Sequence, residues 1–253
     1  MNPKISVIIC TYNRAHYIVQ AIESVLRQDF TDLEIIIIDD ASNDNTGEIV
    51  KKYSNQDPRI KYFLNEHNLG IAKNRNKGVR LARGQYIAML DSDDYWIGKD
   101  KLQKQFAFLE AWPEVGLIGT DISRVDENSL ELGKDYFETV DSAIRKKILL
   151  RNQFAQSSIL FRKDVFNNVG GYDESFSVAE DYDLWLRMGK ISKLANLKET
   201  ATAYRLHIGS ISKNRIKEMI LMTDKIIVKN KECYPNYFLA KIKSVLRLIK
   251  VSI

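Results

Sequence analysis

Short apolar runs alternate with helix-like segments along roughly the first 120 residues. Four segments have the pattern of strands: 5–10, 33–38, 60–63 and 85–90. The first is a β-branched run, as expected for a strand covered on both faces, the second and fourth indicate buried strands, and the third is short. Three segments between them have the pattern of helices: 18–26, 46–53 and 70–82. Asn13 is the expected N-cap of the first helix. This alternation predicts a Rossmann-like α/β fold, with a mostly parallel central sheet flanked by helices.

The alternation weakens from about residue 121, although further elements are predicted. Helices are expected at 141–151 and 180–188, strands at 157–161 and 194–206, and a helical tail from about residue 215. From Lys213 to Ile253 there are ten basic and three acidic residues, whereas the first 212 residues carry 28 basic and 30 acidic ones. We therefore predict one domain over residues 1–212, divided near residue 120, and a basic helical C-terminal extension over 213–253.

Composition excludes several classes of protein. The chain has 253 residues, 45% apolar and 28% charged, which is typical of a soluble globular protein. Because the excess of basic residues lies in the tail and forms no stripe interleaved with aromatics, we expect no nucleic-acid partner. No segment approaches the roughly 20 apolar residues of a membrane span, and the first apolar run is too short for a signal peptide. Cys10 and Cys233 give neither a disulfide framework nor a metal-binding spacing, so we expect a cytoplasmic protein with reduced thiols.

An acidic cluster, Asp91-Ser92-Asp93-Asp94, directly follows the apolar run that ends at Leu90. Ionised carboxylates packed this closely repel one another and are costly to remove from water, and a hard divalent cation relieves both costs. The simpler interpretation is a solvated acidic turn that caps the next helix. A calcium loop of the EF-hand type is excluded, because its sixth and twelfth positions require Gly and Glu but hold Trp96 and Leu102.

Polar residues also follow the first two predicted strands. Thr11-Tyr12-Asn13 comes after the first strand and Asp39-Asp40 after the second. Because ligands bind beyond the carboxyl ends of parallel strands, we expect these residues and the acidic cluster to share one edge of the sheet. Asp39 and Asp40 could instead only cap the helix that follows. Adjacent strand residues point to opposite faces, so Asp40 is the expected ligand of the two.

Taken in order, five motifs resemble those of the family 2 inverting glycosyltransferases. They are Thr11-Tyr12-Asn13-Arg14, Ile38-Asp39-Asp40-Ala41-Ser42, Asn68-Leu69-Gly70, Ala88 to Asp94, and Glu180-Asp181. The resemblance spans about residues 4 to 212 and implies a GT-A type nucleotide-diphospho-sugar transferase fold. It implies transfer of a sugar, expected from a UDP-sugar, to a glycan or lipid-linked acceptor in cell-surface polysaccharide or glycolipid assembly. Residues 1–120 would bind the nucleotide and residues 121–212 the acceptor.

The resemblance also implies roles for individual residues. The nucleotide sugar would be bound by residues at the strand ends and around the helix after Gly70: Thr11, Tyr12, Asn13, Asp40, Asn68, Arg75, Asp91 and Ser92. Within this set, Asp40 would hold the nucleoside and Asp91 the ribose. From its chemistry alone, Arg75 could pair with a diphosphate or with the acidic cluster, or lie on a solvated helix face.

Mn²⁺ or Mg²⁺ is the implied cofactor, with Asp93 as a ligand and His207 as a further ligand or a diphosphate contact. An ion of the Mg²⁺ type needs only one or two carboxylates besides substrate phosphates. A lone histidine can also be purely structural, and the sequence leaves the role of His207 open.

Asp181 is the implied general base, which would deprotonate the acceptor hydroxyl on the face opposite the leaving group. The neighbouring Glu180 and a position inside a cleft would raise its pKa toward that task. The alternative is that these two acids only favour a helix N-terminus.

The end of the chain has an amphipathic pattern. In residues 241–253, one helical face carries Ile242, Val245, Leu246, Ile249 and Ile253, and the cations Lys243, Arg247 and Lys250 lie beside it. Such a helix suits an anionic membrane, which would make the protein peripheral on the inner face of that membrane. It could equally pack on the domain, or on a second subunit in a homodimer.

Two other functions stay open at this point. One is aspartate-dependent phosphoryl transfer, which also uses acids at strand ends, although its acidic motif would follow the first strand rather than the fourth. The other is nucleotide-sugar binding without turnover, against which the presence of both Asp93 and Asp181 argues. A dehydrogenase is not expected, because no G-x-G-x-x-G follows the first strand.

Overall fold

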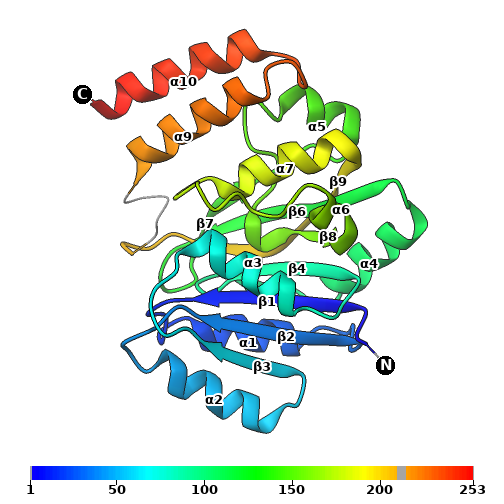
Figure 1. Ribbon diagram of the computed structural model, residues 1–253, viewed down its shortest axis with the longest axis vertical. Helices are drawn as coiled ribbons and strands as arrows, with labels where there is room; N and C mark the ends of the chain where they lie inside the picture. Colours follow the sequence, from blue (N-terminus) through cyan, green and yellow to red (C-terminus); the bar gives the residue numbers. More distant parts are fainter. Residues whose placement is uncertain (1, 210–214, 253) are drawn as a thin grey trace.

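The first part of the chain alternates strands and helices as predicted. In the computed structural model, which describes residues 2–209 and 215–252, the elements in order are β1 (Ile5–Thr11), α1 (Ile18–Leu26), β2 (Leu33–Asp39), α2 (Thr46–Gln56), β3 (Ile60–Leu64), α3 (Ile71–Leu81) and β4 (Tyr86–Asp91) (Figure 1). The strands β3, β2, β1 and β4 are parallel neighbours in that order. The predicted N-cap is wrong: α1 begins at Ile18, and Asn13 lies outside it in a left-handed conformation.

The second part is more irregular than its sequence pattern. Its elements are β5 (Tyr95–Trp96), α4 (Lys101–Ala111), β6 (Val115–Val125), β7 (Glu131–Asp135), α5 (Asp141–Lys147), the 3₁₀ turn η1 (Gln156–Ser158), β8 (Leu160–Arg162), α6 (Lys163–Asn168), α7 (Glu180–Ile191), β9 (Lys193–Arg205), α9 (Ile216–Lys229) and α10 (Tyr237–Ser252). The helix predicted at 141–151 ends early, and the strand predicted at 157–161 is a 3₁₀ turn followed by a short strand. The predicted 180–188 helix, 194–206 strand and helical tail are confirmed.

All strands of the described residues join one mixed sheet, in the order β3-β2-β1-β4-β8-β6-β9-β5, with β7 paired to β6 outside this path. β8 is antiparallel to both β4 and β6, so β6 runs in the same direction as β4. β9 is parallel to β6, and β5 is antiparallel to β9. The sheet is therefore continuous from the first half of the chain into the second.

Strand register brings the predicted polar residues to one edge. Thr11 is paired with Asp39 across β1 and β2, and Cys10 is paired with Asp91 across β1 and β4. The polar residues that follow these strands therefore leave the sheet side by side. This is the arrangement that the alternation of strands and helices predicts.

Alternation within each strand supplies two cores, one on each face of the sheet. Along β1, Ile8 and Cys10 pack on the side of α3 and α7, whereas Val7 and Ile9 pack on the side of α1 and α4. Because both faces are covered, the central strands are apolar at most positions. The buried exceptions Ser6 and Glu34 satisfy each other, because the Ser6 hydroxyl donates to the Glu34 carboxylate at 2.7 Å.

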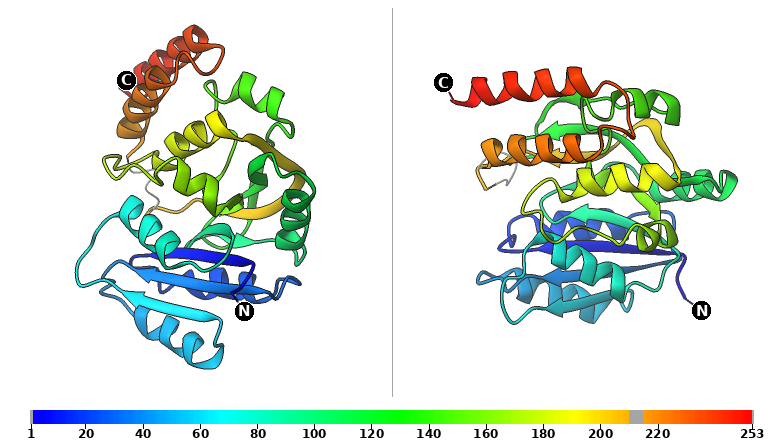
Figure 2. Two further views of the ribbon diagram at one scale, coloured as in Figure 1. Left: turned by 45° about the vertical axis from the view of Figure 1, so that its right-hand side comes forward. Right: turned by 45° about the horizontal axis from the view of Figure 1, so that its top comes forward.

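The tail forms a helical hairpin at the end of the molecule opposite β3 (Figures 1 and 2). α9 packs on α7 and on α10. α10 buries Ala240 and Ser244, whereas Ile242, Val245 and Leu246 are more than half exposed. The described part of the apolar face predicted for residues 241–253 therefore does not pack on the domain, and Ile253 lies outside the described residues. Within residues 2–209 and 215–252, no helix is long and apolar enough to cross a membrane.

Candidate active site

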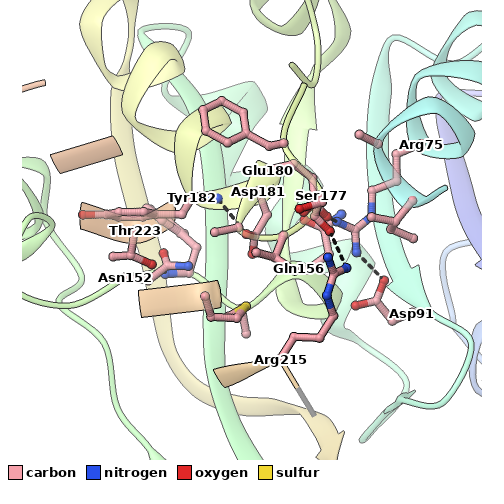
Figure 3. Close-up of a pocket in the computed structure, with 18 of the residues that line it drawn as sticks. Arg75, Asp91, Asn152, Gln156, Ser177, Glu180, Asp181, Tyr182, Arg215 and Thr223 are labelled. Atoms are coloured by element: carbon pink, nitrogen blue, oxygen red, sulfur yellow. Dashed lines mark hydrogen bonds and ion pairs between the residues drawn. The ribbon is translucent and has the colours of Figure 1, made fainter. Parts of the chain in front are cut away.

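A cavity of about 1490 Å³ runs from the carboxyl ends of β1 and β4, past the start of α7, to α9 and α10. Most of the predicted site residues line it: Thr11, Tyr12, Asn13, Asp40, Asn68, Arg75, Asp91, Ser92, Asp93 and Asp181. His207 is buried behind Asp93 rather than in the wall itself. In the view of Figure 3, Asp181 lies between Arg75 and Asp91 on one side and Asn152 and Thr223 on the other.

The segment after β1 presents polar groups that are held from behind. Asn13 adopts a left-handed conformation with φ of 52°, in which its N–H donates to the Ser42 hydroxyl (2.9 Å) and its Oδ1 accepts from the N–H of Asn43 (2.8 Å). Thr11 is buried, and its hydroxyl has no partner among the described residues. A buried hydroxyl without a partner on a cavity wall is suited to a hydrogen bond with a ligand.

Asp40 organises the loop in front of α3. Its carboxylate accepts hydrogen bonds from the backbone N–H of Leu69 (2.8 Å) and Gly70 (3.0 Å) and from the side chain of Asn65 (2.8 Å). The amide of Asn68 donates to the Asp40 carbonyl at 3.4 Å. Asp40 therefore does not cap the helix that follows it.

Asp39 points to the other side, as the alternation along a strand predicts. It accepts from the Tyr62 hydroxyl (2.8 Å) and the backbone N–H of Ser42 (2.9 Å), and it is fully buried away from the cavity. The first turn of α2 is held by Asp44 instead, which accepts from the N–H of Thr46 at 3.0 Å.

Arg75 connects the end of β4 with the start of α7. Its guanidinium is buried and forms ion pairs with Asp91 (2.7 Å) and Glu180, and it lies 5.6 Å from the centre of the Tyr172 ring (Figure 3). Of the three alternatives left open for Arg75, the structure therefore shows the ion pair with the acidic cluster. A buried arginine between two carboxylates fixes both of them, and with them the distance between the end of β4 and the start of α7.

The acids of the cluster have different surroundings. Asp94 is buried, accepts from the Ser157 hydroxyl and from the N–H of Arg205 (2.8 Å), and so ties β4 to the end of β9. Burial, followed by the charges of Asp93 and Asp91, raises the pKa of Asp94 well above its usual value. Asp94 is therefore a structural acid: all three acids border the cavity, but Asp94 is only 2% exposed, whereas the side chains of Asp93 and Asp91 are 19% and 28% exposed.

Asp93 lies between an imidazole and a guanidinium. Its Oδ2 is 2.9 Å from Nε2 of His207 and 3.4 Å from Nε of Arg14. Because the N–H of Gly209 donates to Nδ1 of His207 (3.1 Å), Nε2 carries the proton and donates to Asp93. Burial alone would raise the pKa of Asp93, but the hydrogen bond from His207 and the charge of Arg14 lower it.

The donor set around Asp93 fits a divalent cation that takes its other ligands from substrate and water. Asp93 offers carboxylate oxygen and His207 an imidazole nitrogen, both suited to Mn²⁺. Across residues 2–209 and 215–252, no group of three or more His, Cys, Asp or Glu side chains could hold a metal alone. Two protein ligands plus a diphosphate is the mode in which Mg²⁺ is usually held.

Asp181 sits in the first turn of α7, beside a strained residue. Ala179, which precedes the helix, has a left-handed φ of 60°, and the N–H of Tyr182 donates to Asp181 Oδ1 at 2.7 Å. Burial, followed by the negative charge of Glu180, raises the pKa of Asp181 from 3.8 to about 7, although Arg75 opposes the shift. A carboxylate with this pKa can accept a proton near neutral pH.

The sequence-based prediction misses two residues that line the cavity. Gln156 in η1 donates to the Tyr172 hydroxyl (2.9 Å), and its Oε1 is buried without a partner in the described part of the chain. No local pattern indicates it, because η1 is positioned by its contacts with β4, β6 and β9, which are distant in sequence from one another. Arg14 belongs to a recognised motif, but only the fold shows its contact with Asp93.

Comparison with known proteins identifies the family. Residues 6–170 match the model of glycosyl transferase family 2. An uncharacterised glycosyltransferase of Methanocaldococcus jannaschii is 33% identical over 241 residues, which cover 92% of this chain and 82% of the relative. The Escherichia coli enzyme WfaP, a UDP-Glc:α-D-GlcNAc-diphosphoundecaprenol β-1,3-glucosyltransferase, is 34% identical over 219 residues, covering 85% of this chain and 82% of its own.

Solved structures share the fold. TarS of S. aureus in complex with UDP-GlcNAc gives a TM-score of 0.72 over 97% of this chain and 71% of that one, at 22% identity. The mannosyltransferase PcManGT of Pyrobaculum calidifontis, in complex with GDP-Man and Mn²⁺, gives 0.71 over 100% of this chain and 76% of that one, at 18% identity. At these identities the likeness establishes the GT-A type α/β fold alone. Together with the family match, it shows that the chain belongs to glycosyl transferase family 2 and is a glycosyltransferase.

Proposed function

We propose that this enzyme transfers a sugar, with inversion, from a UDP-sugar to a hydroxyl of a lipid-linked or polysaccharide acceptor. The observation that carries the proposal is Asp181, a carboxylate with a pKa of about 7 in the same cavity as the acidic end of β4. The UDP-sugar donor and the lipid-linked acceptor are supported by the names of relatives such as the Escherichia coli glucosyltransferase.

In this proposal the nucleoside lies at the strand ends. Thr11, Tyr12 and Asn13 contact the base, the region of Asp40 and Asn68 holds the nucleoside, and Asp91 with Ser92 contacts the ribose. Support comes from the unpartnered hydroxyl of Thr11 and from the rigid loop that Asp40 holds. Because Asp40 already accepts three hydrogen bonds, we propose that it acts mainly by shaping this loop.

The reaction itself is assigned to Asp181. It accepts the proton of the acceptor hydroxyl while the oxygen attacks the anomeric carbon and the nucleoside diphosphate leaves from the opposite face. Arg75 holds Glu180 and Asp91 in place, and so positions α7 against the nucleotide end. Gln156, with its unpartnered carbonyl oxygen, is suited to accept a hydrogen bond from a sugar hydroxyl.

We assign Mn²⁺ or Mg²⁺ to Asp93 and His207. Bound there, the cation supplies neutralisation of the charge that develops on the departing diphosphate. To hold the cation through Nε2, His207 would carry its proton on Nδ1, where it would no longer accept the hydrogen bond from Gly209. Removal of the cation with EDTA should abolish UDP release, and Mn²⁺ should restore it.

We propose that different parts of the chain bind the two substrates. Residues 1–120 are proposed to bind the donor and residues 121–212 the acceptor, while residues 213–253 extend the acceptor side through α9 and α10, which line the cavity.

We also propose that α10 rests on an anionic membrane. Its outward face carries Ile242, Val245 and Leu246, all at least half exposed, beside cations. The paired substitution Ile242→Glu with Leu246→Glu should abolish sedimentation with phosphatidylglycerol vesicles, while Leu130→Glu, at an equally exposed leucine on the β6–β7 hairpin, should not. If the wild type instead forms a dimer and does not bind vesicles, and the paired substitution dissociates that dimer, this face contacts a second copy of the chain.

The catalytic proposal is tested by UDP release from a panel of UDP-sugars, with GDP-Man as a nucleotide control and Mn²⁺ present. We expect one UDP-sugar to be turned over, and its release of UDP to rise with a lipid-linked acceptor. Donor binding without UDP release from any sugar would instead indicate a binding module. A beryllofluoride adduct on an aspartate, without UDP release, would favour phosphoryl transfer.

A further inference from the structure

The cavity continues beyond Asp181 into a part that the transfer reaction alone does not require. There its walls are formed by α9, α10 and the segment between α5 and η1, and they are largely apolar: Leu149, Leu150, Ile216, Met219, Ile220 and Val251. Asn152 and Thr223 lie between this part and Asp181 (Figure 3). An acceptor whose hydroxyl reaches Asp181 would extend into this space.

Among the cations that line this part of the cavity, three from two segments lie close enough for their charges to act on one another. Lys243 and Arg247 lie one turn apart on α10, and Arg151 follows α5. Arg151 pairs with Asp135 at 3.0 Å and lies 5.2 Å from the centre of the Phe137 ring. Neither Lys243 nor Arg247 has a carboxylate within ion-pair distance in residues 2–209 and 215–252, which the structure describes.

This arrangement is unfavourable without an anion. Partial loss of solvent, and then the positive charges of Arg247 and Arg151, lower the pKa of Lys243. Cations that face one another across a hollow repel, and surface cations with a free choice of rotamer would move apart. An anionic group with several oxygens would satisfy all three, as phosphate does for arginine and lysine.

We propose that Lys243, Arg247 and Arg151 bind the phosphate group of a lipid-linked acceptor, with the start of its hydrocarbon chain against the apolar wall of α9 and α10. This inference rests on the proposed function and names the substrate class of its acceptor end: a glycosyl phosphate or diphosphate carried on a lipid. The sugar reaches Asp181, the phosphate meets the cations, and the chain leaves toward the exposed apolar face of α10. Charge complementarity and the apolar lining, side by side in one cavity, favour this occupant over a neutral glycan.

The test is calorimetric titration of the full chain, saturated with UDP, with farnesyl diphosphate as the probe. Inorganic pyrophosphate tests the phosphate alone, and octyl glucoside below its micelle concentration tests the apolar part alone. We expect farnesyl diphosphate to bind at least about tenfold more tightly than either, since one hydrogen bond to a charged group corresponds to roughly a tenfold change in affinity.

The variant that removes the site is Lys243→Gln with Arg247→Gln, which should weaken farnesyl diphosphate binding about a hundredfold. Its matched control is Lys217→Gln with Lys225→Gln, which removes the same charge from exposed positions on α9 outside the cavity and should change the affinity less than about threefold. Equal weakening in both pairs, or none in the first, would overturn the site. An affinity for inorganic pyrophosphate equal to that for farnesyl diphosphate would refute the proposal that the acceptor is lipid-linked.

The proposed function is tested separately, by UDP release from the wild-type chain. Failure of that assay would refute glycosyl transfer from a UDP-sugar and leave the titration result as it stands. Failure of the titration would refute the phosphate site and leave the donor end unaffected.

Discussion

The raised pKa of Asp181 makes the pH dependence of transfer a quantitative prediction. A general base works as the carboxylate, so kcat/KM should fall as pH drops through the pKa of about 7. One unit below that pKa, about a tenth of the molecules carry the ionised base, and two units below, about a hundredth. The acid limb should therefore have a slope of one, and the rate should level above it.

The substitution Glu180→Gln should shift the acid limb of the pH profile to lower pH. It removes the negative charge that, after burial, contributes most to the raised pKa of Asp181, and it leaves Arg75 with one carboxylate fewer to neutralise it. Both changes favour the ionised form of Asp181, so the midpoint of the limb should move down by about one unit. The side chain of Gln keeps nearly the same size, so the helix start should be retained.

The assay is UDP release with saturating metal between pH 5 and pH 9, for the wild type, for Glu180→Gln, and for Glu48→Gln as an exposed control on α2. The wild type and Glu48→Gln should share a midpoint near neutral pH. A flat profile across the acid range would refute Asp181 as the titrating base. An unmoved midpoint in Glu180→Gln would refute the electrostatic coupling between the two acids.

Two further predictions concern stability. Lys101 is fully buried beside Trp96, and burial lowers its pKa from 10.5 to about 7. Between these two pH values the unfolded chain binds one proton more than the folded chain. The unfolding free energy of the wild type should therefore rise with pH by about 1.4 kcal/mol per pH unit relative to that of Lys101→Met. Urea titrations at pH 7, 8 and 9 check this, and parallel stability curves for the two proteins would contradict it. Gly78→Ala should lower the unfolding free energy by about 1–2 kcal/mol despite its better helix propensity, because the new Cβ would clash with Cγ2 of Ile8; an unchanged urea midpoint would show that α3 shifts without cost.

Much of the first half of the fold is predictable because its elements follow simple periods. The mainly apolar runs of β1, β2 and β4 indicate strands covered on both faces, and parallel strands bring their carboxyl ends together. Thr11, Asp40 and Asp91 reach one edge for that reason alone. The order of motifs then indicates the family, which no single motif does.

The second half of the fold is less predictable because tertiary contacts determine it. The sequence of strand β6 shows neither the alternation of a half-buried strand nor a continuous apolar run, because Gly116 and Gly119 interrupt it. These glycines are the points where Ser192 and Asn196, respectively, approach the strand closely. The contacts of Arg14 and Gln156 depend on segments that are far apart in the sequence. The sequence alone likewise leaves open whether the apolar face of α10 is covered.

The substitution Asp181→Asn tests the central claim most directly. The amide keeps the size of the side chain and its place in α7, but it cannot accept the proton of the acceptor hydroxyl. Transfer should fall by at least about a hundredfold, while the dissociation constant of UDP, measured calorimetrically with Mn²⁺ present, should change less than about twofold. Transfer by Asp181→Asn within about tenfold of the wild type, with UDP binding intact, would contradict the assignment of Asp181 as the base.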